Sequence, residues 1–300
     1  MILEDLKRYG PEASPAAVSP EEARAYCRRL AKTHYENFTV ASWFLSGKLK
    51  QHFYNVYAYC RWADDLADET GDSARGAALL DWWETLLDDC YEGRATHPVF
   101  VALSETIRRF AVPKTPFSDL LVAFRRDQEP AVYETKEDLL DYCRYSANPV
   151  GRIVLYLMES HDEERGGLSD SVCTGLQLVN FWQDVARDWS IGRVYLPLAD
   201  RAAFGYDDAM LHARTYNEPF RRLMEAEVDD AAGRLRAGLP LVRMVSRRAG
   251  AQIALFLHGG LAVAKALRRI DYDVWRTRPT LSNSDKLKIL LRCCFRRTAF

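Results

Sequence analysis

Apolar residues recur at three- and four-residue steps along almost the whole chain, which is the spacing of one face of an α-helix. A helix is expected to begin at Pro20, because Ser19 can cap it and acidic residues follow in its first turn. No alternating apolar and polar run bounded by Asn-Gly or Asp-Gly predicts a β-hairpin. The chain is therefore expected to be all-α, with further helices over 51–69, 74–92, 98–110, 117–127, 137–145, 148–160, 169–189, 207–236, 239–246 and 249–270.

The breaks between these helices, such as 112–114 and 165–167, are too short to be interdomain linkers. One helical core can hold a chain of 300 residues, so we predict a single domain over 1–300. The net charge of −1 gives no reason to expect a nucleic-acid partner. Seven cysteines without a CxxC pair predict free thiols in a reducing compartment. With neither a secretory signal nor a run of ~20 apolar residues, the expected location is cytoplasmic.

The first acidic cluster lies in the predicted helix 51–69. Asp64 and Asp68 are four residues apart and share a helix face, with Arg61 and Tyr57 one and two turns earlier. Asp65 points about 100° away from that face. A solvated face of an ordinary amphipathic helix would explain this cluster equally well.

The second acidic cluster lies in the predicted helix 169–189. Its polar residues fall on one face at three- and four-residue steps, and the remainder of the helix is strongly apolar. They are Gln177, Asn180, Asp184 and Asp188. Carboxylates on a buried helix need partners, and Arg187 could pair with only one of them. Mg²⁺ prefers oxygen ligands, so two such helices facing each other across a cavity would hold Mg²⁺ ions with a diphosphate between them.

At these motifs the chain resembles the squalene/phytoene synthase family. The DDxxD-type motif at 64–68 and NxxxDxxxD at 180–188 match its two magnesium motifs. Segments 34–42, 192–197 and 272–279 are most similar to the hydroxysqualene synthase branch of bacterial hopanoid biosynthesis. The resemblance implies a class I isoprenoid synthase helical bundle around a central cavity.

The resemblance also implies roles for individual residues. The metal ligands would be Asp64, Asp68, Asn180, Asp184 and Asp188, holding about two or three Mg²⁺ ions with the diphosphate. The substrate-binding residues would be His34, Asn37, Phe38, Arg61, Gln177, Asn180 and Arg193. The catalytic residues would be Tyr57, Arg61, Tyr145, Tyr195 and Tyr272. By residue type alone, the tyrosines and His34 are more often structural. Asn37, Gln183 and Asn148-Pro149 depart from the pattern of many relatives.

The implied reaction converts presqualene diphosphate and water to hydroxysqualene and diphosphate, in squalene and hopanoid biosynthesis, without a nicotinamide cofactor. Head-to-head prenyl transfer is the alternative, with farnesyl diphosphate as a substrate and presqualene diphosphate, squalene or phytoene as the product. A non-catalytic assembly factor of the same fold is disfavoured, because the acidic motifs are intact. The oligomeric state is left open.

The C-terminal segment 286–297 interleaves basic and apolar residues. Such a helix can lie on the inner face of an anionic membrane, which would make the protein peripheral. A helix packed on the bundle with its arginines in solvent explains the same pattern, and we favour that interpretation.

Overall fold

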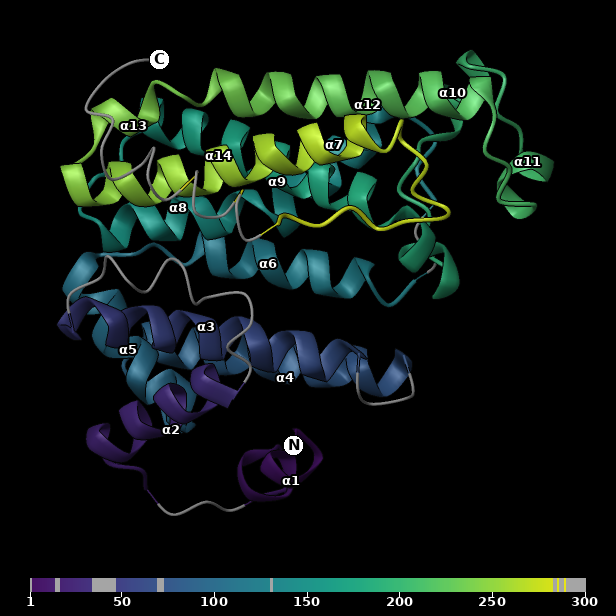
Figure 1. Cartoon of the computed structure of the whole chain (residues 1–300). Helices are drawn as coiled ribbons and strands as arrows, with labels where there is room; N and C mark the ends of the chain where they lie inside the picture. The colour runs from purple at the N-terminus through teal and green to yellow at the C-terminus, as the bar shows by residue number, and fades with distance from the viewer. Residues whose placement is uncertain are drawn as a thin grey trace. The chain divides into compact units, whose positions relative to one another are not determined.

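The structure is a computed structural model that describes residues 2–13, 17–33, 47–68, 73–129 and 132–282, with 285 and 289. The regular elements in these ranges are all helices, so the all-α prediction is confirmed (Figure 1). The chain divides into two compact units, which are described separately. Unit 1 is 1–129 with 153–160, and unit 2 is 130–152 with 161–300.

Unit 1 is a set of helices around an aromatic core. The helices are α1 (Ile2–Tyr9), α2 (Pro20–Thr33), α3 (Gly47–Asp68), α4 (Ser73–Tyr91), α5 (Pro98–Phe110), α6 (Thr115–Arg126) and the second half of α8 (Asn148–Leu157). Trp62 and Trp83 stack with ring centroids 5.1 Å apart, and His97 meets both edge-on. Burial lowers the pKa of His97 to about 3, so its ring is neutral and packs as an aromatic residue.

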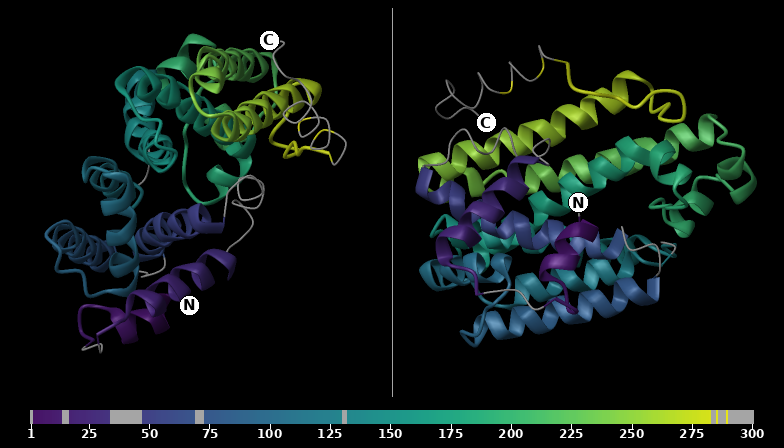
Figure 2. Two further views of the ribbon diagram at one scale, coloured as in Figure 1. Left: turned by 90° about the vertical axis from the view of Figure 1, so that its left-hand side faces the viewer. Right: turned by 90° about the horizontal axis from the view of Figure 1, so that it is seen from below.

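Unit 2 contains the second acidic motif. Its helices are α7 (Lys136–Ser146), the first half of α8, α9 (Glu163–Ser190), α10 (Leu198–Ala203), α11 (Asp208–His212), α12 (Glu218–Ala237), α13 (Leu241–Met244) and α14 (Arg247–Arg269). Helices α9, α12 and α14 run side by side (Figures 1 and 2). Gly175 permits the approach of α9 to α12, because a Cβ there would lie 2.9 Å from Leu235 and 3.0 Å from the carbonyl oxygen of Ala231. The long helix α9 is thereby held on its apolar side.

The predicted start of α2 is confirmed by its cap. The amide of Glu22 donates to the hydroxyl of Ser19 at 3.3 Å, and the amide of Ser19 donates to the Glu22 carboxylate at 2.9 Å. These reciprocal bonds form a capping box, which satisfies amides that the first turn leaves open. Helix α1 was not predicted from the sequence.

Two boundary predictions were wrong. The predicted break at 165–167 lies inside α9, because Asp162 caps the helix by accepting from the amide of Arg165 at 2.8 Å. The predicted helix 207–236 is two helices, α11 and α12. Arg214 adopts a left-handed φ of 51° between them, and Asn217 caps the second by accepting from the amide of Phe220 at 3.0 Å.

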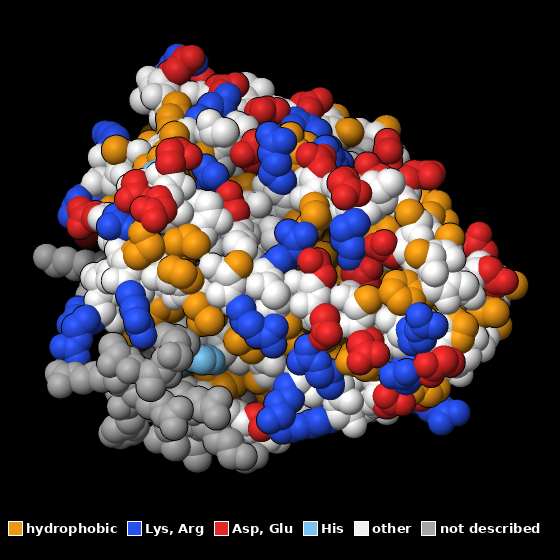
Figure 3. Space-filling view, turned by 90° about the horizontal axis from the view of Figure 1, so that it is seen from above, with side chains coloured by type: hydrophobic (Ala, Val, Ile, Leu, Met, Phe, Trp, Pro, Cys, Tyr) orange, Lys and Arg blue, Asp and Glu red, His pale blue; other side chains and the backbone are white. Residues whose placement is uncertain are grey.

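The free thiols and the mixed surface charge are those expected from cysteines without a CxxC pair and from a net charge of −1. Cys27, Cys60, Cys90, Cys143 and Cys173 are free, as predicted, and burial raises their pKa values. Cys293 and Cys294 lie outside the described residues. Charges of both signs are interspersed on the face viewed from above Figure 1 (Figure 3).

Within the described residues, α14 is the one helix long and apolar enough to cross a membrane. More than half of its apolar window is buried, and it packs on α9, α12 and α13. These contacts are those of a core helix.

Candidate functional site

Helix α9 separates its polar stripe from its apolar residues as the sequence predicts. Its apolar side is buried, through Leu178, Val179, Phe181, Trp182 and Val185. Asn180 is exposed and Gln177 is half-buried, whereas the side chain of Asp184 is only 18% exposed. The amides of Gln177 and Asn180 are therefore accessible to a ligand, whereas the carboxylate of Asp184 is mostly shielded from water.

A glycine turn returns the chain to Asp188 at the end of α9. Gly192 has a φ of +80° and donates to the carbonyl of Trp189 at 3.1 Å, while Arg193 donates its amide to the carbonyl of Asp188 at 2.9 Å. This pair of bonds is a Schellman motif, which needs a left-handed residue at the position of Gly192. It brings Arg193 beside the last carboxylate of the stripe.

The two carboxylates of the stripe influence each other. The pKa of Asp188 is raised to about 6, first by burial and then by the negative charge of Asp184. Arg193, Arg187 and Arg278 oppose this shift through their positive charge. A cation bound between two such carboxylates would relieve their repulsion.

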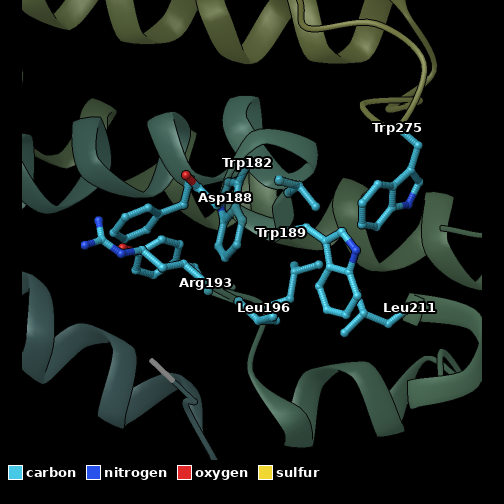
Figure 4. Close-up of a pocket in the computed structure, with 11 residues that line it drawn as sticks. Trp182, Asp188, Trp189, Arg193, Leu196, Leu211 and Trp275 are labelled. Atoms are coloured by element: carbon cyan, nitrogen blue, oxygen red, sulfur yellow. The ribbon is translucent and has the colours of Figure 1, made fainter. Parts of the chain in front are cut away.

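Asp188 and Arg193 also line a pocket with apolar walls (Figure 4). Tyr195 forms one wall and stacks on Phe181, with ring centroids 3.7 Å apart and an interplanar angle of 11°. The far end of the pocket is lined by residues that the sequence analysis did not select, namely Trp189, Leu211 and Trp275. They come from three separate segments, so no local spacing could have identified them.

Asp184 is paired with an arginine that the sequence analysis did not assign to the site. The guanidinium of Arg278 donates from Nε to Oδ1 and from Nη2 to Oδ2 of Asp184, the second bond at 2.9 Å. The two residues are 94 positions apart in the sequence. This bidentate pair places a positive charge directly on the second acidic motif.

The first acidic motif lies on α3, in unit 1, around Arg61. This guanidinium pairs with Asp64 at 3.0 Å and also with Asp65. The side chain of Asp65 is 5% exposed and that of Asp64 is 44% exposed, while Asp68 is exposed. Tyr57 is half-buried, and burial raises its pKa against the opposing charge of Arg61. Asp64 and Asp68 are therefore the accessible acids, and Asp65 is the buried partner of Arg61.

The other predicted residues differ in their surroundings. Tyr145 is half-buried with the guanidinium of Arg144 5.0 Å from its ring centroid. Tyr272 is buried near Arg268, which is an ion-pair partner of Asp229, and it does not line the described pocket. His34, Asn37 and Phe38 lie outside the described residues.

The described side chains include no group of three or more His, Cys, Asp or Glu residues arranged to hold a metal. Mg²⁺ does not need such a cage, because it is commonly held by one or two carboxylates together with water and phosphate oxygens. The repelling pair Asp184 and Asp188 fits that mode of binding.

An all-helical chain with a polar stripe that ends in two partly buried carboxylates, adjacent arginines and an aromatic pocket agrees with the class of isoprenoid synthases. Within this class, the chain belongs to the squalene/phytoene synthase family, whose model matches residues 31–285. The family resemblance predicted from the two acidic motifs is thereby confirmed.

Individual relatives are similar over different shares of the chain. A crystal structure of squalene synthase HpnC from Alicyclobacillus acidocaldarius is 44% identical, with a TM-score of 0.81, and covers 84% of this chain and 95% of its own. A hydroxysqualene synthase from Rhodopseudomonas palustris is 36% identical over 173 residues, which are 56% of this chain and 58% of that enzyme. A 15-cis-phytoene synthase from Synechocystis is 27% identical over 304 residues, and the match covers 96% of this chain and 89% of that enzyme.

Proposed function

We propose that this protein is a Mg²⁺-dependent hydroxysqualene synthase, which converts presqualene diphosphate and water to hydroxysqualene and diphosphate. The observation that carries the proposal is the higher identity to HpnC and to hydroxysqualene synthase than to the phytoene synthases, at 44% and 36% against 27–30%. The family membership makes a prenyl diphosphate the substrate class.

Magnesium would be held by Asp184 and Asp188 with Asn180, and by Asp64 and Asp68 of the first motif. When bound, it would neutralise charge on the diphosphate and so assist loss of this leaving group. Arg193 and Arg61 would supply further positive charge to the departing diphosphate. His34, Asn37, Phe38 and Gln177 remain proposed diphosphate contacts.

Once the carbon–oxygen bond breaks, the substrate carries a positive charge that must be protected until water adds. Aromatic faces stabilise such a cation, and Tyr195 of unit 2 is proposed to help stabilise it. Tyr57, Tyr145 and Tyr272 stay proposals for steering the cation. Addition of water and loss of one proton complete the reaction, so no hydride donor is needed.

Head-to-head condensation of two prenyl diphosphates is the second candidate, supported by the phytoene synthase that aligns with 96% of the chain. Hydroxysqualene synthase consumes presqualene diphosphate and water, whereas the condensation consumes two molecules of a prenyl diphosphate such as farnesyl diphosphate. The purified protein with Mg²⁺ is given presqualene diphosphate or farnesyl diphosphate, with and without a reduced nicotinamide. We expect hydroxysqualene from presqualene diphosphate in both cases.

Presqualene diphosphate formed from farnesyl diphosphate would instead favour the transferase. Squalene formed only with the nicotinamide would identify hydride as the terminating reagent. Either result contradicts the proposed reaction. We further propose that the protein works in the cytoplasm.

A further inference from the structure

The segment that follows α14 forms a strap, residues 270–282, which turns back towards α9 (Figure 1). Tyr272 and Val274 are buried and fix its first part. Pro279 is buried as well, whereas residues 276–278 between these anchors are exposed. Within the strap, Asp273 accepts from the amides of Arg276 and Thr277, each at 3.3 Å, whereas the side chain of Arg278 bonds to α9.

Two consecutive residues of the strap bond to two consecutive residues of α9. Arg278 forms the bidentate pair with Asp184, and the side-chain amide of Gln183 donates to the carbonyl of Pro279 at 2.5 Å. Gln183 is 9% exposed, so this bond is shielded from water. The buried amide fixes the backbone next to Arg278, which in turn fixes where its guanidinium lies.

Both carboxylate oxygens of Asp184 are engaged by this guanidinium. Each oxygen keeps a further lone pair, but a divalent cation bound there would lie beside the guanidinium and would be repelled by its positive charge. The carboxylate is mostly withdrawn from water, so it needs a positive partner in either state. Arginine and metal are thus alternative partners for one negative charge.

We propose that Arg278 holds the cation position at Asp184 in the metal-free protein, that Gln183 keeps it there, and that metal binding releases the 276–278 stretch. This inference rests on the proposed function, because it takes Asp184 as a metal ligand. Gln183 is a positioning residue, acting through Arg278. The exchange makes the metal-free site electrically neutral at Asp184 and delays metal binding until the guanidinium can leave.

The first consequence concerns affinity for the metal alone. Arg278→Gln removes the competitor and leaves Asp184 without its cation, so Mn²⁺, used as a probe for Mg²⁺, should bind about three- to tenfold more tightly. Free Mn²⁺ is measured by electron paramagnetic resonance. The matched control is Arg276→Gln, which removes the same charge two residues away, where Arg276 is 82% exposed and faces Asp273 at 3.5 Å.

The control is expected to bind Mn²⁺ like the wild type, and Arg278→Lys should lie between the wild type and Arg278→Gln. Equal affinity of Arg278→Gln and the control would overturn the exchange. So would weaker binding by Arg278→Gln than by the control.

The second consequence concerns the strap itself. Hydrogen exchange of the peptide over 276–282 should become faster when Mn²⁺ is added to the wild type, since the strap loses an anchor. In Gln183→Leu, which removes the amide at similar volume, the metal-free protein should already exchange faster. Unchanged exchange in both experiments would contradict the proposal, provided that circular dichroism shows native helix content.

Asp184→Asn separates this inference from the proposed function. If Asp184→Asn binds Mn²⁺ as well as the wild type, Asp184 is not a metal ligand and the proposed function loses its site. If Asp184→Asn binds more weakly while Arg278→Gln matches Arg276→Gln, the metal role stands and only the exchange is wrong.

Discussion

Asp184 is both a proposed Mg²⁺ ligand and the observed partner of Arg278. Asp184→Asn should lower kcat by at least about 100-fold, because it removes a charged ligand from the proposed Mg²⁺ site. Asp64→Asn should have a similar effect, since it does the same in the first motif. Steady-state kinetics with presqualene diphosphate measure both, with Asp230→Asn as a control that breaks only a partly exposed pair with Arg234. A correctly folded Asp184→Asn enzyme with near-wild-type kcat would refute the metal assignment.

The charged carboxylate of Asp188 lowers the stability of the metal-free fold, whereas that of Asp184 does so less because it is paired. Asp184 is neutralised by Arg278, but the pKa of Asp188 is about 6 against an ordinary 3.8, chiefly because it is partly buried. The folded state therefore holds the Asp188 proton more tightly than the unfolded chain, and above pH 6 the charged carboxylate destabilises the fold.

Asp188→Asn should then raise the melting temperature at pH 7.5 without metal by about 2 °C, which corresponds to about 1 kcal/mol for a partly exposed group. The gain should shrink as the pH falls through about 6 and vanish near the ordinary pKa, where the wild-type carboxyl is protonated in both states. Melting curves from pH 4 to 8 test this. A gain that is independent of pH would show that the charge of Asp188 is not its cause.

At the scale of elements, α9 offers a pair of glycines to compare, one in its first turns and one in the turn that follows its end. Gly192 has a φ of +80° and an added Cβ would meet no atom within 4 Å, so Gly192→Ala is penalised by conformation alone, by about 1 kcal/mol. Gly167 lies in the first turns of the same helix, also with open space around a Cβ but without a positive φ. Gly167→Ala should therefore stabilise by about 0.5–1 kcal/mol.

Urea denaturation gives the two free energies of unfolding, and opposite signs are expected. If both alanines stabilise, the turn that returns Arg193 to Asp188 does not depend on the left-handed residue. The pair is informative because both residues are glycines with open space around an added Cβ, whereas their backbone conformations differ.

The elements also indicate what a sequence can and cannot predict. Ser19 with Glu22 is a local signal, and the start of α2 was placed correctly from it. Gly166 and Gly167 were interpreted as a break, but the Asp162 cap and packing of the long helix α9 outweigh their low helix propensity. The Asp184 partner Arg278 is 94 residues away and depends on the path of the strap, which has no periodic pattern.

At the scale of the whole molecule, the two acidic motifs were recognisable because each is complete within one helix. The aromatic pocket was not, since α9, α11 and the strap each supply part of it. The prediction of one domain stays a prediction beside the division into two compact units. The roles proposed for His34, Asn37 and Phe38 depend on a segment outside the described residues.

The last prediction concerns attachment of the whole protein to a membrane through the basic segment 286–297, most of which lies outside the described residues. Two described positions favour a packed segment. Ile289 is 8% exposed, and Asp285 faces Arg269 of α14 at 3.5 Å. A segment whose apolar residue is already buried has less apolar surface to insert into lipid. We therefore expect the protein to bind anionic vesicles no better than a variant with three basic residues of this segment replaced by glutamine, namely Lys286, Lys288 and Arg292.

Co-sedimentation with vesicles of phosphatidylcholine and phosphatidylserine, at low and physiological salt, measures this binding. A third protein carries three glutamines elsewhere, at the exposed Arg108, Arg236 and Lys265, and so has the same net charge as the segment variant. Binding that is lost in the segment variant but kept in this charge-matched protein would establish the segment as a membrane anchor. Equal binding of all three proteins at physiological salt is the outcome that the packed segment predicts, because an anchor would lose about 1 kcal/mol for each basic residue removed.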